Sequence, residues 1–183
     1  MNTILIIATV FVSIIILFFL VALFSRKTYK IERTISISKP PQDVFKYIRN
    51  IRNQDHYNKW VMADPNMKKT FVGTDGNKGF IYGWDGNKKA GAGEQEILNI
   101  DNESRIEMEV RFLRPFKGIA YSTMETASLN GSAHHKNSTE VKWTFSSKLK
   151  YPVNIFLLIT NIENAMGKDL DLSLSKLKSI LEK

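Results

Sequence analysis

The sequence of 183 residues contains no cysteine. A disulfide framework is therefore excluded, as are a thiolate nucleophile and a thiolate metal site. Charge is also absent from one part of the chain, since no Asp, Glu, Lys, Arg or His occurs before Arg26. All 26 basic and 18 acidic side chains follow that point, so the two parts of the chain are suited to different solvents.

The charge-free part contains an apolar run from residue 3 to residue 24. A helix over this run would be about 33 Å long, which matches the ~30 Å hydrocarbon core of a bilayer. A secretory signal peptide would instead show a positive start, a shorter apolar stretch and an A-x-A-like cleavage site, and the run has none of the three. The sequence therefore predicts a transmembrane anchor over residues 1–27, with an uncleaved helix over about 3–24, followed by one domain over residues 28–183.

Positive charge follows the predicted helix and indicates its orientation. The next basic residues are Arg26, Lys27, Lys30 and Arg33, whereas only the α-amino group precedes the helix. The positive-inside rule then predicts a single-pass protein of the cell membrane whose soluble domain is cytoplasmic. The same four residues are predicted to contact the membrane surface through anionic lipid headgroups, and the alternative is a plain stop-transfer flank.

The formal net charge of the chain is +8. Its basic residues are scattered rather than gathered in one stripe with interleaved aromatic residues, so no nucleic-acid partner is predicted. A soluble part of about 155 residues is large enough for one domain with its own core and too short for two.

Alternating apolar and polar side chains over residues 28–38 predict a strand with one buried face. Pro41 marks the start of a short helix, and a second short helix is predicted over residues 51–60. Six further strands, separated by turn residues, are predicted over 71–72, 80–84, 95–100, 105–112, 118–129 and 139–149. Strands so closely spaced form an antiparallel meander rather than crossover units.

The C-terminal part has apolar residues at steps of three and four. These residues are Ile155, Ile159, Ile162, Met166, Leu170, Leu174, Leu177 and Leu181. They predict one long amphipathic helix over residues 154–182 that packs on the apolar face of the sheet. Gly167 within this helix predicts either a cost of about 1 kcal/mol relative to Ala or a kink or close approach of another segment.

This order of elements is that of the helix-grip fold. Six stretches carry a likeness to a known family: 35–48 (ISISKPPQDVFKYI), 57–60 (YNKW), 79–86 (GFIYGWDG), 91–97 (GAGEQEI), 139–143 (TEVKW) and 172–182 (LSLSKLKSILE). In this order they resemble START-like proteins of the SRPBCC superfamily, in the polyketide cyclase/dehydrase-like branch, over nearly all of residues 29–183. The resemblance implies an α+β domain in which a curved antiparallel sheet of about six to seven strands surrounds a long C-terminal helix, with a cavity between them.

Members of this family bind lipids, sterols, polyketides or other apolar molecules, and only some of them are enzymes. The resemblance therefore implies a membrane-anchored protein that binds a hydrophobic small molecule or lipid in that cavity. Two alternatives stay open: a cyclase or dehydratase that acts on an apolar substrate, and a regulatory or structural module with a solid interior that contacts another membrane protein. The oligomeric state also stays open.

Nine residues are predicted to line the cavity, because alternation or helical spacing turns them toward the interior. They are Trp60, Phe80, Tyr82, Trp84, Met108, Phe112, Trp143, Met166 and Leu170. Aromatic and methionine side chains also fill solid cores, which is the alternative for each of them.

No catalytic residue, metal ion or cofactor is predicted. The acid and base candidates are Asp85, Glu94, Glu96, Glu107, Glu109, Glu125 and His56. None shows a pairing that would raise its pKa, so all are interpreted as surface groups. His134 and His135 lie in a polar hairpin with no carboxylate at ligand spacing. The apolar residues 153–159 are predicted to pack on neighbouring strands, and the alternative is a membrane-facing gate to the cavity.

Overall fold

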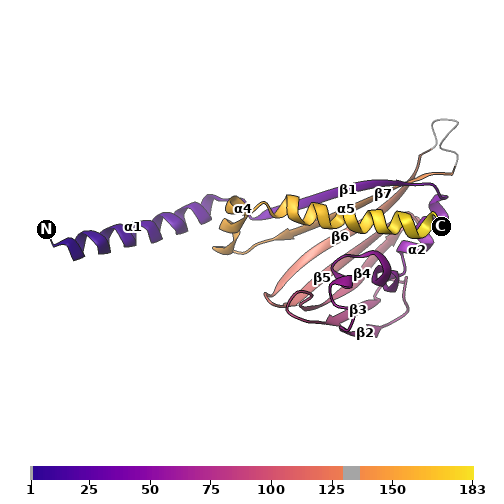
Figure 1. The fold of residues 1–183 in the computed structure, drawn as a ribbon, viewed down its shortest axis with the longest axis horizontal. Coiled ribbons are helices and arrows are strands. Elements are labelled where there is room, and N and C mark those ends of the chain that lie inside the picture. The colour runs from indigo at the N-terminus through magenta and orange to yellow at the C-terminus, as the bar shows by residue number, and fades with distance from the viewer. Residues whose placement is uncertain (1, 130–136) are drawn as a thin grey trace.

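The computed structural model describes residues 2–129 and 137–183 of the chain. One helix, α1 (Thr3–Phe24), extends away from a domain that contains all the other elements (Figure 1). The hydroxyls of Thr9 and Ser13 donate to carbonyl oxygens one turn earlier, so neither is left without a partner. By length and composition α1 can cross a membrane, and a secretory signal sequence would meet the same two criteria.

Seven antiparallel strands form one curved sheet. They are β1 (Thr28–Ile37), β2 (Lys68–Val72), β3 (Ile81–Asp85), β4 (Ala92–Asp101), β5 (Arg105–Arg114), β6 (Gly118–Ser128) and β7 (Thr139–Lys148). Their order across the sheet is β1-β7-β6-β5-β4-β3-β2. Strands β2 to β7 therefore follow one another as a meander, and β1 pairs with the last strand. The predicted antiparallel sheet of six to seven strands is confirmed.

Between β1 and β2 the chain passes from one edge of the sheet to the other through four short helices. They are α2 (Pro41–Ile48), η1 (Ile51–Asn53), α3 (Gln54–Tyr57) and η2 (Val61–Ala63). The expected second helix ends earlier than residue 60, because the Asn58 side chain accepts the backbone N–H of Trp60 (3.0 Å). Such a bond between a side chain and the local backbone competes with helical hydrogen bonding.

The C-terminal segment forms η3 (Val153–Ile155), α4 (Phe156–Ile159) and α5 (Ile162–Leu181). The prediction of one unbroken helix over residues 154–182 is wrong, because Asn161 is the N-cap of α5. Its side chain accepts the backbone N–H of Asn164 (3.2 Å), which is the usual way in which a new helix begins. As a result Ile159, expected on the apolar stripe of the helix, is 72% exposed.

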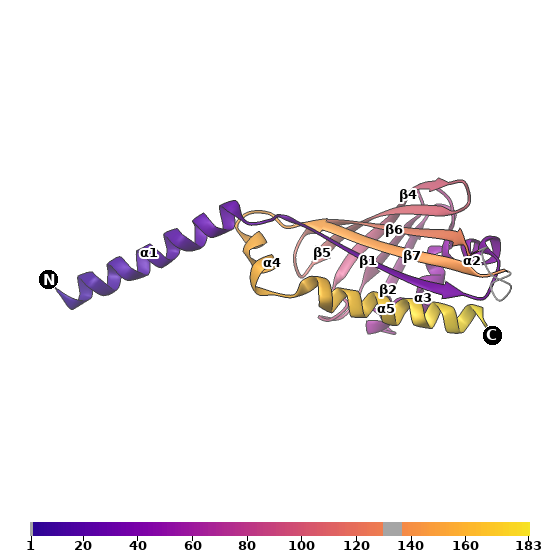
Figure 2. The same ribbon diagram turned by 90° about the horizontal axis from the view of Figure 1, so that it is seen from above.

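Helix α5 runs along β1 on one face of the sheet, as both views show (Figures 1 and 2). The two elements come close at Gly167, where a Cβ atom would collide with the guanidinium of Arg33. Arg33 also forms an ion pair with Asp171 (3.1 Å), which holds it beneath the helix. The glycine therefore serves a close approach rather than a kink.

The core lies between α5, α2 and the inward face of the sheet. Leu170, Leu174 and Leu177 of α5 are fully buried there, together with Phe45 and Ile48 of α2. The apolar side of α5 and the apolar face of the sheet thus bury each other, as the two periodicities of the sequence predict.

Candidate ligand-binding site

A cavity of about 280 Å³ lies between the sheet and the helices that cover it. Side chains from β3 to β7, α3, η2 and the first turns of α5 form its walls. Arg114 and Pro115, together with the end of the β3–β4 loop, complete the wall. The interior is therefore not solidly packed at this position.

A second hollow, of about 590 Å³, lies outside the domain beside the end of α1. It is open, and its few lining residues are mostly apolar side chains of α1 together with Leu158. Because this hollow is a largely open surface, the cavity within the domain is the candidate site.

All three tryptophans of the chain border this cavity. The rings of Trp60 and Trp143 lie edge to face with their centroids 6.4 Å apart, and Phe145 lies 5.7 Å from Trp60. A second edge-to-face pair comes from β3 and β5, where Trp84 lies 6.1 Å from Phe112. Two groups of aromatic rings thus form much of the wall, a surface that suits a flat apolar molecule.

Each indole N–H of these tryptophans already has a hydrogen-bond acceptor. The acceptors are Asp169 for Trp60 (3.0 Å), the carbonyl oxygen of Ala90 for Trp84 (3.2 Å) and the hydroxyl of Ser122 for Trp143 (2.9 Å). The rings are therefore held in place, and they offer a ligand apolar surface rather than hydrogen bonds.

Trp84 reaches its position because Gly93 on β4 has no side chain. The two residues are register partners, and a Cβ atom at Gly93 would lie 2.7 Å from the indole ring. Any larger residue at that point would push the ring away from the strand. A glycine inside a strand often marks such a close approach.

Four neutral polar side chains interrupt the apolar walls. They are Gln54, Asn58, Gln95 and Ser122, all of them buried. The side-chain amide of Asn58 donates to Oε1 of Gln54 (2.8 Å), and the side-chain amides of Gln54 and Gln95 both point their N–H groups at the sulfur of Met108. The hydroxyl of Ser122 accepts from Trp143, and its own proton has no acceptor among the described residues. Such groups can orient a bound molecule that forms hydrogen bonds.

None of these four polar residues was among the predicted lining residues. For two of them the signal was present, since Gln95 is in phase with the buried Ile97 and Ser122 with the buried Ala120 and Met124. The alternation that places apolar side chains inside places these two inside as well. A polar residue in phase with a buried face is the pattern that would have indicated them.

Two tyrosines near the cavity stay protonated. Burial raises the pKa of the Tyr57 hydroxyl far above its ordinary value. Burial also raises the pKa of Tyr82, and its hydrogen bond to Asp55 (2.7 Å) adds to the effect. The Tyr82 hydroxyl is committed to Asp55, so this side chain contributes mainly its ring to the cavity.

The structure brings six of the nine predicted lining residues to the cavity. They are Trp60, Tyr82, Trp84, Phe112, Trp143 and Met166. The other three lie in the solid core: Phe80 stacks on Phe71 (6.3 Å), Met108 lies behind the amides of two glutamines, and Leu170 is fully buried. Alternation of apolar and polar residues shows which face of a strand is buried. It does not show whether a given residue on that face packs in the core or borders the cavity.

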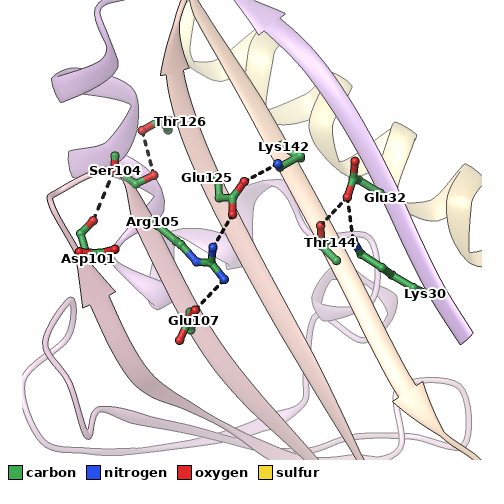
Figure 3. Close-up of polar contacts among 10 residues, drawn as sticks. All are labelled: Lys30, Glu32, Asp101, Ser104, Arg105, Glu107, Glu125, Thr126, Lys142 and Thr144. Atoms are coloured by element: carbon green, nitrogen blue, oxygen red, sulfur yellow. Dashed lines mark hydrogen bonds and ion pairs between the residues drawn. The ribbon is translucent and has the colours of Figure 1, made fainter. Parts of the chain in front are cut away.

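The predicted acid and base candidates lie outside the cavity. On the outer face of the sheet, Arg105 pairs with Glu107 (2.7 Å) and Glu125 (2.9 Å), and Lys142 also pairs with Glu125 (Figure 3). The remaining carboxylates are bound in a similar way, Glu94, Glu96 and Glu109 by Arg111 and Asp85 by Arg114. His56 is exposed. These carboxylates form structural ion pairs.

The four basic residues predicted at the membrane surface, Arg26, Lys27, Lys30 and Arg33, lie in different surroundings. Arg26 pairs with Glu163 (2.8 Å) at the end of α1, and Lys27 follows it directly. Lys30 faces outward and pairs with the glutamate two residues later (3.1 Å). Arg33 lies beneath α5. Arg26 and Lys27 therefore lie at the junction with α1, whereas the charges of Lys30 and Arg33 are compensated by carboxylates within the domain.

Metal ligation finds no support in the described part of the chain. Among residues 2–129 and 137–183, no three His, Asp or Glu side chains are grouped as metal ligands. His134 and His135, considered above for such a site, lie outside the described residues.

The end of α1 is joined to the C-terminal segment by hydrogen bonds. Asn154 of η3 is fully buried, and its Nδ2 donates to the carbonyl oxygens of Ala22 (2.6 Å) and Ser25 (3.3 Å). Carbonyl groups in the last turn of a helix have no donor within the helix. Arg26 adds a bond to the carbonyl oxygen of Leu157 (3.3 Å). The end of α1 is thus completed by residues from the other end of the chain.

The sheet order, the helical connection between β1 and β2 and the helix along the sheet define the fold. The chain has the helix-grip fold, together with an N-terminal apolar helix. No protein-family model matches the sequence, and no curated protein does. Solved structures match it in fold.

Three of these structures illustrate the likeness. Norcoclaurine synthase from Thalictrum flavum, solved with dopamine and hydroxybenzaldehyde, is 14% identical with a TM-score of 0.59 over 85% of this chain and 87% of that chain. The di-domain ARO/CYC BexL of the BE-7585A biosynthetic pathway is 15% identical with a TM-score of 0.57, over 85% of this chain and 50% of that chain. The Aha1 dimer from Colwellia psychrerythraea is 15% identical with a TM-score of 0.56, over 84% and 96%. At such identities the likeness shows the fold and not an activity.

Proposed function

We propose that the protein is a membrane-anchored binding domain for a small hydrophobic molecule, which occupies the cavity without being chemically changed. The observation that carries this proposal is the cavity of about 280 Å³ with its two groups of aromatic rings. The described walls contain no Asp, Glu or His, and the charged lining residues are Lys89 and Arg114. No carboxylate or imidazole is therefore placed there as a general acid or base, which supports binding over a cyclase or dehydratase reaction.

The lining narrows the class of ligand. The volume of about 280 Å³ equals that of about nine water molecules at ~30 Å³ each. This suits a molecule of one or two rings and is too small for a phospholipid with two acyl chains. The aromatic walls favour a flat apolar body, and Gln95 and Ser122 favour one hydroxyl or carbonyl group on it. We expect the ligand to be neutral, because an unpaired charge is costly to bury.

The anchor is part of the proposal and depends on the junction between α1 and the domain. A signal sequence is removed from the mature protein. Removal of α1 would take away the Ala22 acceptor of the buried Asn154 side chain, and an unpaired buried donor is costly. This supports a retained anchor over residues 1–27 and a binding domain over residues 28–183. Lysines that follow the helix, such as Lys27, support a cytoplasmic domain.

Native mass spectrometry of the full chain tests the proposal. The protein is extracted from membranes in a mild detergent and its intact mass is measured after release from the micelle. We expect a chain that retains α1, with a second population heavier by the mass of one small molecule.

The matched control is Val110→Phe, because Val110 borders the cavity and the new ring would occupy it. This variant should lose the added mass. The same added mass on both proteins would show that the molecule binds elsewhere, and a bare parent chain from several lipid-rich preparations would refute the binding function.

A further inference from the structure

An exposed apolar surface lies at the end of the domain that faces α1. It comprises two segments, the end of β5 with the β5–β6 turn (Leu113 and Phe116) and the segment from η3 to α4 (Val153, Phe156, Leu158 and Ile159). We call these six residues the basal surface. Phe116 is 83% exposed, and Leu158 is 55% exposed although the adjacent Leu157 of α4 is buried. Figures 1 and 2 both show the two segments on the α1 side of the sheet.

Uncompensated positive charge surrounds the basal surface. Lys117 follows Phe116, Lys148 and Lys150 come shortly before Val153, and Lys27 follows α1. Among the described residues none of these four lysines forms an ion pair. The stretches 110–124 and 141–162, which contain the whole basal surface, have no Asp or Glu. The outer face of the sheet differs, because its lysines and arginines are paired with glutamates (Figure 3).

The combination of exposed apolar side chains and unpaired lysines fits one kind of partner. Segments that lie at a membrane interface bury Phe, Leu and Ile at the headgroup boundary, while their cations attract anionic lipids. The position of the basal surface agrees with this chemistry. Asn154 of η3 bonds to the last turn of α1, so η3 and α4 lie against the point where the apolar helix ends.

We propose that the basal surface lies in the headgroup layer of a bilayer that contains anionic lipid. This inference rests on the anchor of the proposed function and adds a second contact with the membrane. Arg114 and Pro115, which border the cavity, directly precede Phe116. The wall of the cavity at this end then faces the membrane.

Spin labels on the full chain test the proposal, and the absence of cysteine makes single labelling possible. Phe116→Cys and Ile159→Cys place the label on the basal surface. Val72→Cys is the control, because Val72 is also an exposed apolar residue (61%) but lies at the end of β2 that is remote from Arg114 and the β5–β6 turn. Each protein is reconstituted into vesicles of phosphatidylcholine with and without phosphatidylglycerol. The measurement compares relaxation of the label by oxygen, which dissolves in the bilayer, and by a water-soluble nickel chelate.

In vesicles with phosphatidylglycerol, the ratio of relaxation by oxygen to relaxation by the nickel chelate should be severalfold higher for labels at positions 116 and 159 than for the label at position 72. The preference should weaken in phosphatidylcholine alone and in a variant that carries Lys117→Gln and Lys150→Gln. Labels at 116 and 159 that behave like the label at 72, on a chain that floats with the vesicles, would overturn this proposal and leave the anchor intact. A chain that does not float would refute the anchor and this proposal with it. An equal preference with and without phosphatidylglycerol would overturn the role of anionic lipid.

Discussion

Replacing Val110 by phenylalanine should leave the domain folded and stabilise it slightly. Val110 lies on β5, is 7% exposed and borders the cavity, so the new ring has space to enter. The substitution adds roughly 50 Å³, and at ~24 cal/mol per Å³ of cavity the filled volume is worth about 1 kcal/mol. For a domain of this size, that gain raises the melting temperature by about 2 to 4 °C. The comparison is made on the chain freed of its ligand, because displacement of a bound molecule or of ordered water offsets this gain.

The matched control is Ile106→Phe on the same strand. Ile106 is fully buried and does not border the cavity, so a larger ring there must displace its neighbours. Overpacking of this kind costs about 1 to 3 kcal/mol. The two substitutions should therefore change stability in opposite directions, although both place phenylalanine on an inward position of β5.

Urea unfolding of the full chain in detergent micelles measures the difference. The three tryptophans all border the cavity, so their emission reports the unfolding of this part of the domain. The midpoint should rise for Val110→Phe and fall for Ile106→Phe with an unchanged slope. Equal destabilisation by both substitutions would refute the reasoning, because it would mean that no free space lies beside Val110.

Three further predictions follow from individual contacts. Gln95→Met keeps the size of the side chain and removes its hydrogen bonds. In a fluorescence titration it should weaken binding of a hydroxylated aromatic probe about tenfold and leave unchanged the binding of the same probe without its hydroxyl. The backbone N–H of Ser38 donates to Glu182 (2.6 Å) and lowers the pKa of that carboxyl. Glu182→Gln should therefore cost about 1 kcal/mol of stability at neutral pH and progressively less as the pH falls through and below about 4.5. Thermal unfolding at several pH values measures this difference, and a difference that does not change with pH would contradict the role of the Glu182 charge. A Cβ at Gly167 meets only the guanidinium of Arg33, which can move aside at the cost of its ion pair with Asp171, so Gly167→Ala should be near neutral in the parent chain. Beside Arg33→Ala it should stabilise the domain by up to about 1 kcal/mol, since Ala favours a helix over Gly by about that amount; an equal effect in both backgrounds would contradict the close approach.

Sequence periodicity was sufficient for the sheet and for most of the core. The strict alternation of Ile106, Met108 and Val110 identifies the inward face of β5, and similar patterns identify its neighbours. These signals are strong because each face of an antiparallel strand meets one environment along its whole length. The order of strands then follows from the short turns between them.

The periodicity of apolar residues did not predict the break between α4 and α5, where a single side chain begins a new helix. Ile155 and Ile159 continue the spacing of the later leucines, but Thr160 and Asn161 separate them from α5. The capping bond of Asn161 outweighs the continuity of the apolar pattern. Asn161, a residue type that favours the N-cap and stands directly before Ile162, was the available sign of this break.

The cavity depends on how three distant segments meet, which no local pattern contains. Met166 of α5, Trp60 of the β1–β2 connection and Trp143 of β7 all border it. The sequence shows that each side chain turns inward, but whether they touch or leave a space depends on the tilt of α5 and the curvature of the sheet. The fold was therefore predictable in outline, and the lining of the cavity only in part.

The central claim is that the cavity takes up a small, neutral, largely apolar molecule, and a titration of tryptophan fluorescence tests it most directly. The full chain in detergent is titrated with 6-bromo-2-naphthol, a bicyclic hydroxylated quencher, and with 2-bromonaphthalene, which lacks the hydroxyl. The account predicts saturable quenching by the naphthol, binding of 2-bromonaphthalene weaker by about 1.4 kcal/mol, or tenfold, and loss of saturable quenching in Val110→Phe. Quenching that rises linearly with concentration and is the same in the parent chain and in Val110→Phe would contradict it.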